Sequence, residues 1–193
     1  MFRPYWEVPD SIVRAELIPH LLKDPGYLAR KGFDLVDARQ SVLASGPVTR
    51  QMVSQLRTGK LFVRQKPGPR NSLGLAKFVF PNSYSIYMHD TPATEAFAKS
   101  RRDFSHGCIR VERPAELAAW VLRENPGWDQ DRIRAAMSGS ATAQVNLIHP
   151  IPVFILYIPV IVLEDGPVHF YGDIYAHDAA LQQALVKGYP YPE

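Results

Sequence analysis

The chain contains one cysteine, Cys108, so no disulfide bond can form within it. The fold must therefore rest on a hydrophobic core, and 193 residues with 46% hydrophobic side chains can bury one as a single compact unit. A lone thiol leaves three interpretations open. It is a small buried hydrophobe, a reactive nucleophile or one ligand of a metal ion.

Hydrophobic periodicity predicts a β-rich α+β fold with a mainly antiparallel or mixed sheet and peripheral helices. A helical pattern covers residues 9–22, where Pro19 should kink or weaken it. From Lys60 onward the pattern turns to short apolar runs separated by Gly and Pro turns. We predict strands at residues 33–37, 61–65, 75–80 and 84–89, and helices at residues 25–32, 91–99, 114–123, 129–137 and 178–186.

Two segments need separate interpretations. Residues 45–58 are polar and marked by Gly and Pro, and their pattern predicts no defined element. Residues 151–163 are the most apolar stretch, but they are too short and too interrupted by proline for a membrane-spanning helix. With a turn at residues 164–166 and an apolar run at 168–171, they predict a buried hairpin.

Charge and the N-terminal residues limit the partners that we expect. Lysine and arginine number 22 against 19 acidic residues, and no dense basic run alternates with aromatic residues, so we do not expect nucleic-acid binding. Residues 1–6 lack the apolar region of a signal peptide.

The neighbours of Cys108 favour a nucleophile. A thiol becomes reactive as the thiolate, which needs a base nearby. His106 lies two residues before Cys108, but the intervening glycine can redirect it. His89 lies 19 residues before Cys108, at the end of a predicted strand that would hold its side chain rigidly. We therefore favour His89 as the general base.

Other residues near the thiol suggest how a carbonyl substrate could be held. Gly107 frees the backbone, so that the amides of Gly107 and Cys108 could face an oxyanion. Arg110 could bind a carboxylate or brace the loop. Tyr87 shares a strand face with His89, and it could pack in the core or contact substrate. Zinc bound by His89, His106 and Cys108 is a further alternative, but no paired ligand spacing supports it.

These residues carry a resemblance to a known family. The segments Tyr87-x-His89-Asp-Thr-Pro92 and Ser105-His-Gly-Cys-Ile-Arg-Val111 resemble the catalytic signature of the L,D-transpeptidases with a YkuD-type domain. Segments elsewhere, such as Lys23–Arg30 and Arg64–Gly74, resemble the large Gram-negative branch called YcbB-like. The resemblance covers nearly the whole chain and implies a YkuD-like, sandwich-like mixed β-sheet fold.

The resemblance also implies roles for individual residues. Cys108 would be the nucleophile and His89 the base, with the backbone carbonyl of Asp90 orienting the imidazole. The residues that would shape the oxyanion and substrate pocket or support its loop are Tyr87, Ser105, His106, Gly107 and Arg110. No cofactor and no metal is implied.

The implied reaction is peptidoglycan cross-linking in the periplasm or cell envelope. A donor stem tetrapeptide would acylate Cys108 and release D-Ala, and the diaminopimelate amine of an acceptor stem would then form a 3→3 cross-link. Carbapenem β-lactams would acylate the same thiol. A thiol hydrolase, such as an L,D-carboxypeptidase or an enzyme that cleaves cross-links, is the alternative, and a non-catalytic peptidoglycan-binding domain is a third possibility.

The resemblance suggests a functional division of the chain. Residues 1–60 would form an N-terminal helical segment with a reduced cap over the site, and residues 60–193 would form the catalytic domain. Relatives carry further N-terminal domains and an anchor or signal, and a longer capping insertion in the region of residues 33–60.

Overall fold

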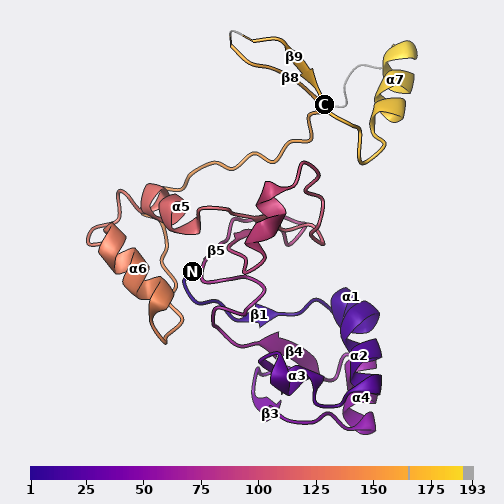
Figure 1. Ribbon diagram of the computed structural model, residues 1–193, viewed down its shortest axis with the longest axis vertical. Helices are drawn as coiled ribbons and strands as arrows, with labels where there is room; N and C mark the ends of the chain where they lie inside the picture. Colours follow the sequence, from indigo (N-terminus) through magenta and orange to yellow (C-terminus); the bar gives the residue numbers. More distant parts are fainter. Residues whose placement is uncertain (165, 189–193) are drawn as a thin grey trace. The chain divides into compact units, whose positions relative to one another are not determined.

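The β-strands of this computed structural model form sheets of four, three and two strands within its described residues, 1–164 and 166–188 (Figure 1). The first sheet has the order β1-β4-β2-β3, all antiparallel. The second has the order β5-β6-β7, in which β5 and β6 are antiparallel and β6 and β7 parallel. The third is the antiparallel pair of β8 and β9. The α+β class with a mixed sheet is confirmed.

The strands are short and the helices lie between them. The strands are β1 (Trp6–Glu7), β2 (Phe33–Val36), β3 (Val42–Ala44), β4 (Phe62–Gln65), β5 (Lys77–Phe78), β6 (Met88–His89), β7 (Ile109–Arg110), β8 (Val160–Val162) and β9 (Val168–Phe170). The helical elements are α1 (Asp10–Ile12), η1 (Val13–Leu17), α2 (Ile18–Lys23), α3 (Tyr27–Arg30), α4 (Arg50–Arg57), η2 (Thr94–Ala98), α5 (Pro114–Val121), α6 (Gln130–Ser138) and α7 (Asp178–Val186).

The contacts of the chain define two units, Met1–Ile151 and Pro152–Glu193. The boundary between the two units falls between Ile151 and Pro152. The boundary reflects how the backbone packs and not which residues take part in a reaction. The functional boundary expected near residue 60 therefore stays a prediction.

The N-terminal helical segment adapts to a proline. Pro19 has no N–H to donate to the carbonyl of Ala15, and the chain takes a π-helical turn, η1, over the residues before it. The helix therefore continues through Pro19. The irregularity expected at this proline takes the form of the π-helical turn η1. Its buried side chains pack with the first sheet and α4 in one hydrophobic cluster that includes Leu21, Leu35, Leu56 and Val63.

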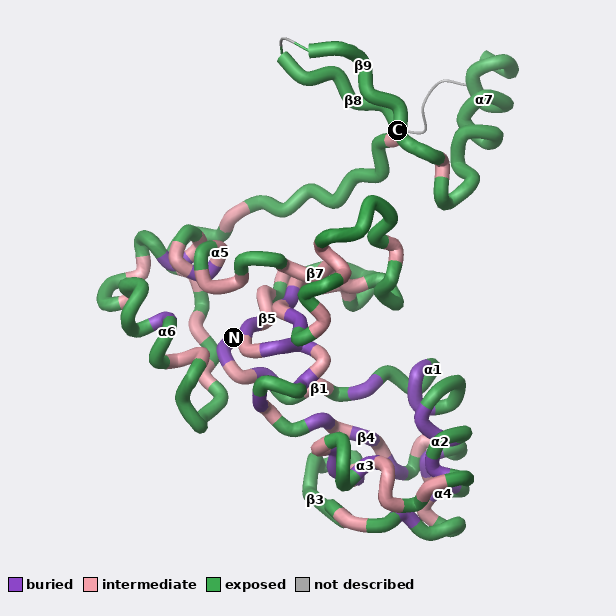
Figure 2. Tube along the Cα trace, in the orientation of Figure 1, coloured by how far each residue is buried: buried purple, intermediate pink, exposed green. Residues whose placement is uncertain are grey.

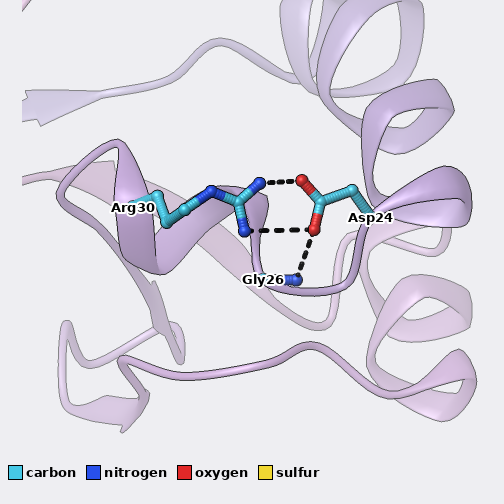
Figure 3. A network of polar contacts seen from close by, with 3 residues as sticks. All are labelled: Asp24, Gly26 and Arg30. Atoms are coloured by element: carbon cyan, nitrogen blue, oxygen red, sulfur yellow. Dashed lines mark hydrogen bonds and ion pairs between the residues drawn. The ribbon is translucent and has the colours of Figure 1, made fainter.

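The turn after α2 is closed by a polar network. The Asp24 carboxylate accepts the Gly26 N–H at 3.1 Å and pairs with the Arg30 guanidinium, which reaches back from α3 (Figure 3). The bond to Gly26 is partly buried and the pair with Arg30 is exposed, and together they link the turn to α3.

Two helical predictions needed correction. Residues 45–58 contain α4, which begins after Thr49, whose hydroxyl accepts the Met52 N–H at 3.2 Å. The helix expected at residues 91–99 is the shorter 3₁₀ helix η2. Thr91 does not cap it, because the Thr91 hydroxyl accepts the Ala93 N–H while the Thr91 N–H donates to Asp90.

A second hydrophobic cluster lies beneath the three-stranded sheet. Phe2, Ala76, Ala118, Leu122 and Ile133 are buried together, and they join the residue before β5 to α5 and α6. Phe2 stacks on Trp128 with ring centroids 5.3 Å apart. The second sheet therefore rests on its own core and not on that of the first sheet.

The second unit contains the predicted hairpin, but the prediction that it is buried was wrong. Every residue of β8 and β9 is exposed, as the burial colouring shows (Figure 2). A two-stranded hairpin of three-residue strands has no second layer of its own against which to bury a face. Residue 165, in its turn, lies outside the described residues.

Within the part of the chain that the structure describes, no helix has the length and apolar character needed to cross a membrane.

Candidate active site

The three-stranded sheet β5-β6-β7 gathers the candidate residues. Lys77 lies opposite His89 in the antiparallel pair, and His89 lies opposite Arg110 in the parallel pair. Residues directly opposite each other in a sheet project from the same face. Tyr87 and Cys108 directly precede β6 and β7, and the Tyr87 ring contacts both Lys77 and His89 from there.

Cys108 lies immediately before β7 and is partly buried. Its loop is bound to the neighbouring strand by the Ile109 N–H, which donates to the Tyr87 carbonyl at 3.0 Å. Gly107 has a φ of +126°, a conformation that side chains rarely adopt. Glycine is therefore required at the turn that delivers the thiol to the sheet edge.

Tyr87 contacts the thiol directly. Burial raises the pKa of Tyr87, and the charge of Cys108 and a hydrogen bond with Cys108 raise it further. The Tyr87 hydroxyl therefore stays protonated at neutral pH. The Tyr87 and His89 rings meet edge to face at 5.8 Å between centroids. Tyr87 therefore bridges the cysteine and the histidine.

His89 is only 6% exposed, and the backbone of Asp90 orients its ring. Its Nδ1 lies 2.5 Å from the Asp90 carbonyl oxygen. A carbonyl can only accept, so we assign the proton to Nδ1, which leaves Nε2 with a lone pair. Burial lowers the pKa of His89, the Asp90 carbonyl partly offsets this, and Arg110 lowers it further. His89 is therefore neutral near pH 7, as a base must be.

The Asp90 carboxylate has a structural task. Its Oδ2 accepts the Leu75 N–H at 2.8 Å, and its Oδ1 accepts the Thr91 N–H at 2.7 Å. It packs on Gly74, which has a φ of +60° and where an added Cβ would overlap the carboxyl group. Asp90 thus holds in place the backbone whose carbonyl orients His89.

This anchor is continuous with the first sheet through a buried asparagine. The Asn71 amide donates to the carbonyls of Pro4, Gln65 and Lys66, and its oxygen accepts the Leu73 N–H. Asn71 is 1% exposed. The turn from β4 to Gly74 is therefore rigid, and Leu75 is held where Asp90 can accept its N–H.

The exposed loop before Cys108 has polar contacts of its own. His106 Nε2 lies 2.8 Å from Glu16 Oε1 of η1, so this imidazole is engaged by a carboxylate. The Gly107 N–H donates to the Ser105 hydroxyl at 3.2 Å, so in this state it is occupied within the loop. Arg110 donates to the Phe104 carbonyl at 3.4 Å and braces the loop from β7.

The structure thus brings together Cys108, Tyr87, His89, Arg110 and the Asp90 carbonyl, and it directs His106 to Glu16. Sequence reasoning missed Lys77, Glu16 and Asn71. Lys77 carried a usable signal, because it is the charged residue between apolar neighbours in the predicted strand 75–80. Glu16 and Asn71 bond with residues far away in the sequence, so the local sequence pattern gave no signal for either.

The residue types here suit acyl transfer to sulfur. In the described ranges 1–164 and 166–188, no group of three or more His, Cys, Asp or Glu side chains is arranged to hold a metal ion. A thiol, a neutral imidazole with a free Nε2 and a phenol donor are together the groups that nucleophilic attack on a carbonyl requires.

Comparison with known proteins shows the family to which the chain is similar. The family model for YkuD, the L,D-transpeptidase catalytic domain, matches residues 1–153. A protein of Haemophilus influenzae named "Putative L,D-transpeptidase" is 30% identical over 191 residues. The match takes in 96% of this chain and 38% of the relative, so the chain spans well under half of that protein's length.

Proposed function

Because the chain belongs to the family of YkuD-type L,D-transpeptidase catalytic domains, we propose that it transfers peptidoglycan stem peptides through a thioester on Cys108. The observation that carries the proposal is the group of side chains at β6 and β7 and at the residues directly before them. There Tyr87 contacts both Cys108 and His89, and the Asp90 carbonyl fixes the imidazole with Nε2 available.

The first half-reaction forms the acyl-enzyme. His89 Nε2 takes the Cys108 proton, and the sulfur attacks the carbonyl carbon between diaminopimelate and D-Ala of a donor tetrapeptide. The oxyanion forms beside the Tyr87 hydroxyl and the Cys108 amide. His89 then returns the proton to the departing amine, so that D-Ala leaves as a neutral amine and a thioester remains.

The second half-reaction consumes the thioester. The side-chain amine of diaminopimelate on an acceptor stem attacks the thioester carbonyl and loses a proton to His89. The C–S bond breaks, a 3→3 amide forms, and the Cys108 thiolate takes the proton back. The enzyme is unchanged, and D-Ala is the released product.

The Gly107 amide could join the oxyanion site after a loop change. It now donates to Ser105, and a rotation that releases this bond would turn the N–H toward the carbonyl. His106, held by Glu16, and Arg110, bound to the Phe104 carbonyl, would then keep the loop within reach of the sheet.

A hydrolase is the second candidate. Acyl-enzyme formation is the same, and water replaces the acceptor amine, which gives an L,D-carboxypeptidase or a cross-link hydrolase. Residues 105–107 of the loop are exposed, so the acyl-enzyme would be open to solvent unless the acceptor or a cap covers it. If residues 1–60 act as the proposed cap, they would influence whether water or an acceptor amine reaches the acyl-enzyme.

Action on peptidoglycan would require a location in the cell envelope, and carbapenems would acylate Cys108 as donor mimics. Muropeptide analysis after incubation with purified sacculi separates the two candidates. Transpeptidation gives new cross-linked dimers and free D-Ala, whereas hydrolysis gives trimmed or released stems. If sacculi treated with wild-type protein match those treated with Cys108→Ala, both candidates are wrong.

A further inference from the structure

The turn between β4 and β5 directs consecutive backbone amides from the first sheet to Asp90. In order along the chain, the N–H groups of residues 72–75 donate to Gln65 Oε1 at 2.9 Å, Asn71 Oδ1 at 2.8 Å, the Asn71 carbonyl at 2.8 Å and Asp90 Oδ2 at 2.8 Å. The first three acceptors belong to β4 and the turn, and the fourth belongs to the residue whose carbonyl orients His89. The path of this turn therefore determines where the Asp90 side chain is held.

The two amide side chains that hold the turn are buried. Gln65 is 5% exposed, and its Nε2 donates to the carbonyls of Lys31 and Arg70, both at 3.2 Å. Asn71 is 1% exposed, and its amide is bound through both the nitrogen and the oxygen. Buried polar groups without partners are costly, so each side chain has one favoured orientation. A replacement without these polar atoms would leave N–H and carbonyl groups of the turn unpaired and let the turn move.

A movement of the turn would reach the imidazole through Asp90. Leu75 donates to the Asp90 carboxylate, and Gly74 packs on it with no room for a methyl group between them. The carbonyl and the carboxylate of Asp90 belong to one residue, so they shift together. The proton of a neutral imidazole stays on Nδ1 while that nitrogen has its acceptor, which for His89 is the Asp90 carbonyl.

We propose that Gln65 and Asn71 are positioning residues of this site. Their side chains hold the turn that holds Asp90, and they thereby keep the His89 proton on Nδ1 and the lone pair on Nε2. They act through Asp90 and not on the substrate. This inference rests on the proposed role of His89 as the base, and it makes the first sheet part of what aligns that base.

The test is the nitrogen NMR spectrum of the histidine rings near pH 7, where His89 is neutral. A long-range proton–nitrogen correlation shows which ring nitrogen carries the proton, and His89→Gln identifies the His89 signals among those of the six histidines. We expect the wild-type His89 ring to be protonated at Nδ1. Asn71→Ala should move its signals toward the average of two exchanging tautomers and should slow acylation by a carbapenem about ten- to a hundredfold.

Leu35→Ala is the matched control. Leu35 is also 1% exposed, and it lies in the same sheet, on β2 opposite Val63 of β4. Its truncation removes apolar packing but leaves the polar contacts of the turn in place. The His89 signals and the acylation rate of this variant should therefore match those of the wild type.

Thermal unfolding verifies that each variant is folded under the conditions of the spectra. If Asn71→Ala is not folded, Gln65→Met replaces it. Methionine has nearly the length of glutamine, and this change removes the Nε2 donor and the Oε1 acceptor together. It should shift the His89 signals in the same direction as Asn71→Ala.

Wild-type His89 signals in the folded Asn71→Ala or Gln65→Met protein overturn the proposal. A shift of equal size in Leu35→Ala also overturns it, because lost stability and not the turn would then move the ring. The spectra need no substrate, so the outcome is separate from that of the proposed function. If the wild type forms no carbapenem adduct while Asn71→Ala still changes the tautomer, the function fails and the role of the two amides stands.

Discussion

At the scale of single residues, the two histidines near Cys108 have different partners. His89 is buried with Nδ1 on the Asp90 carbonyl, whereas His106 is exposed and pairs with Glu16. Since a base must present a free nitrogen to the thiol, we expect His89→Ala to slow acylation by about two to four orders of magnitude. His106→Ala should stay within a few-fold of wild type. Stopped-flow acylation by a carbapenem measures both, and a normal rate in His89→Ala would move the base role to His106.

The same histidine sets the acid limit of the reaction. Its pKa is lowered from the ordinary histidine value of 6.5, first by burial and then by Arg110 and Lys77. The active form is the neutral one, and it therefore persists as pH falls through 6.5 and is lost only at lower pH. We predict a rate of acylation that is flat across pH 6.5 and falls below it. An acid limb centred above 6.5 would show that the imidazole is stabilised in its charged form instead.

At the scale of elements, the turn before β5 positions the base through Asp90. Gly74 and Gly32 both have positive φ values, +60° and +73°, but only Gly74 lies against another group, the Asp90 carboxyl. Gly32→Ala should cost about 1–2 kcal/mol from backbone strain alone. Gly74→Ala should cost about 1–3 kcal/mol more, since Asp90 must shift.

Denaturant unfolding of the two glycine variants gives these free energies. The acylation rate should also fall in Gly74→Ala and not in Gly32→Ala, because only the former displaces the carbonyl that orients His89. Equal losses of stability in the two variants would contradict the packing of Asp90 on Gly74.

The elements also show what the sequence could and could not predict. Local alternation identified the strand ending at His89, and the glycine before Cys108 indicated the turn that the structure contains. The helix α4 was missed although Thr49 is a good N-cap and Val53 and Leu56 have helical spacing, because the polar surface residues obscured the pattern. The predicted strands, such as 75–80 and 84–89, were longer than those of the structure. A strand ends where the neighbouring strand no longer pairs with it, and the local sequence pattern does not show that point.

Contacts distant in the sequence were beyond local reasoning. The Glu16–His106 pair joins residues 90 positions apart, and Asn71 reaches the Pro4 carbonyl 67 positions away. Local periodicity carries no information on such pairs. The prediction that the hairpin of β8 and β9 is buried was wrong for the same reason. The apolar composition of a segment does not show which other surface, if any, covers that segment.

At the scale of the whole molecule, two hydrophobic clusters support different parts of the first unit. Leu35 belongs to the cluster of the N-terminal sheet, and Ile133 belongs to the cluster beneath β5. Both side chains are 1% exposed, so truncating either to alanine should cost about 2–5 kcal/mol. Only Ile133→Ala should also change the alkylation rate of Cys108 well below the melting temperature. The same loss of reactivity in Leu35→Ala would show that the two cores act as one.

The account depends most directly on Cys108 being the atom that takes the acyl group. Intact-protein mass after incubation with an imipenem-type carbapenem tests this. We predict one adduct on the wild-type chain, located on Cys108, and none on Cys108→Ser, which should unfold at the wild-type temperature. The absence of an adduct on the wild type, or an equal adduct on Cys108→Ser, would contradict it.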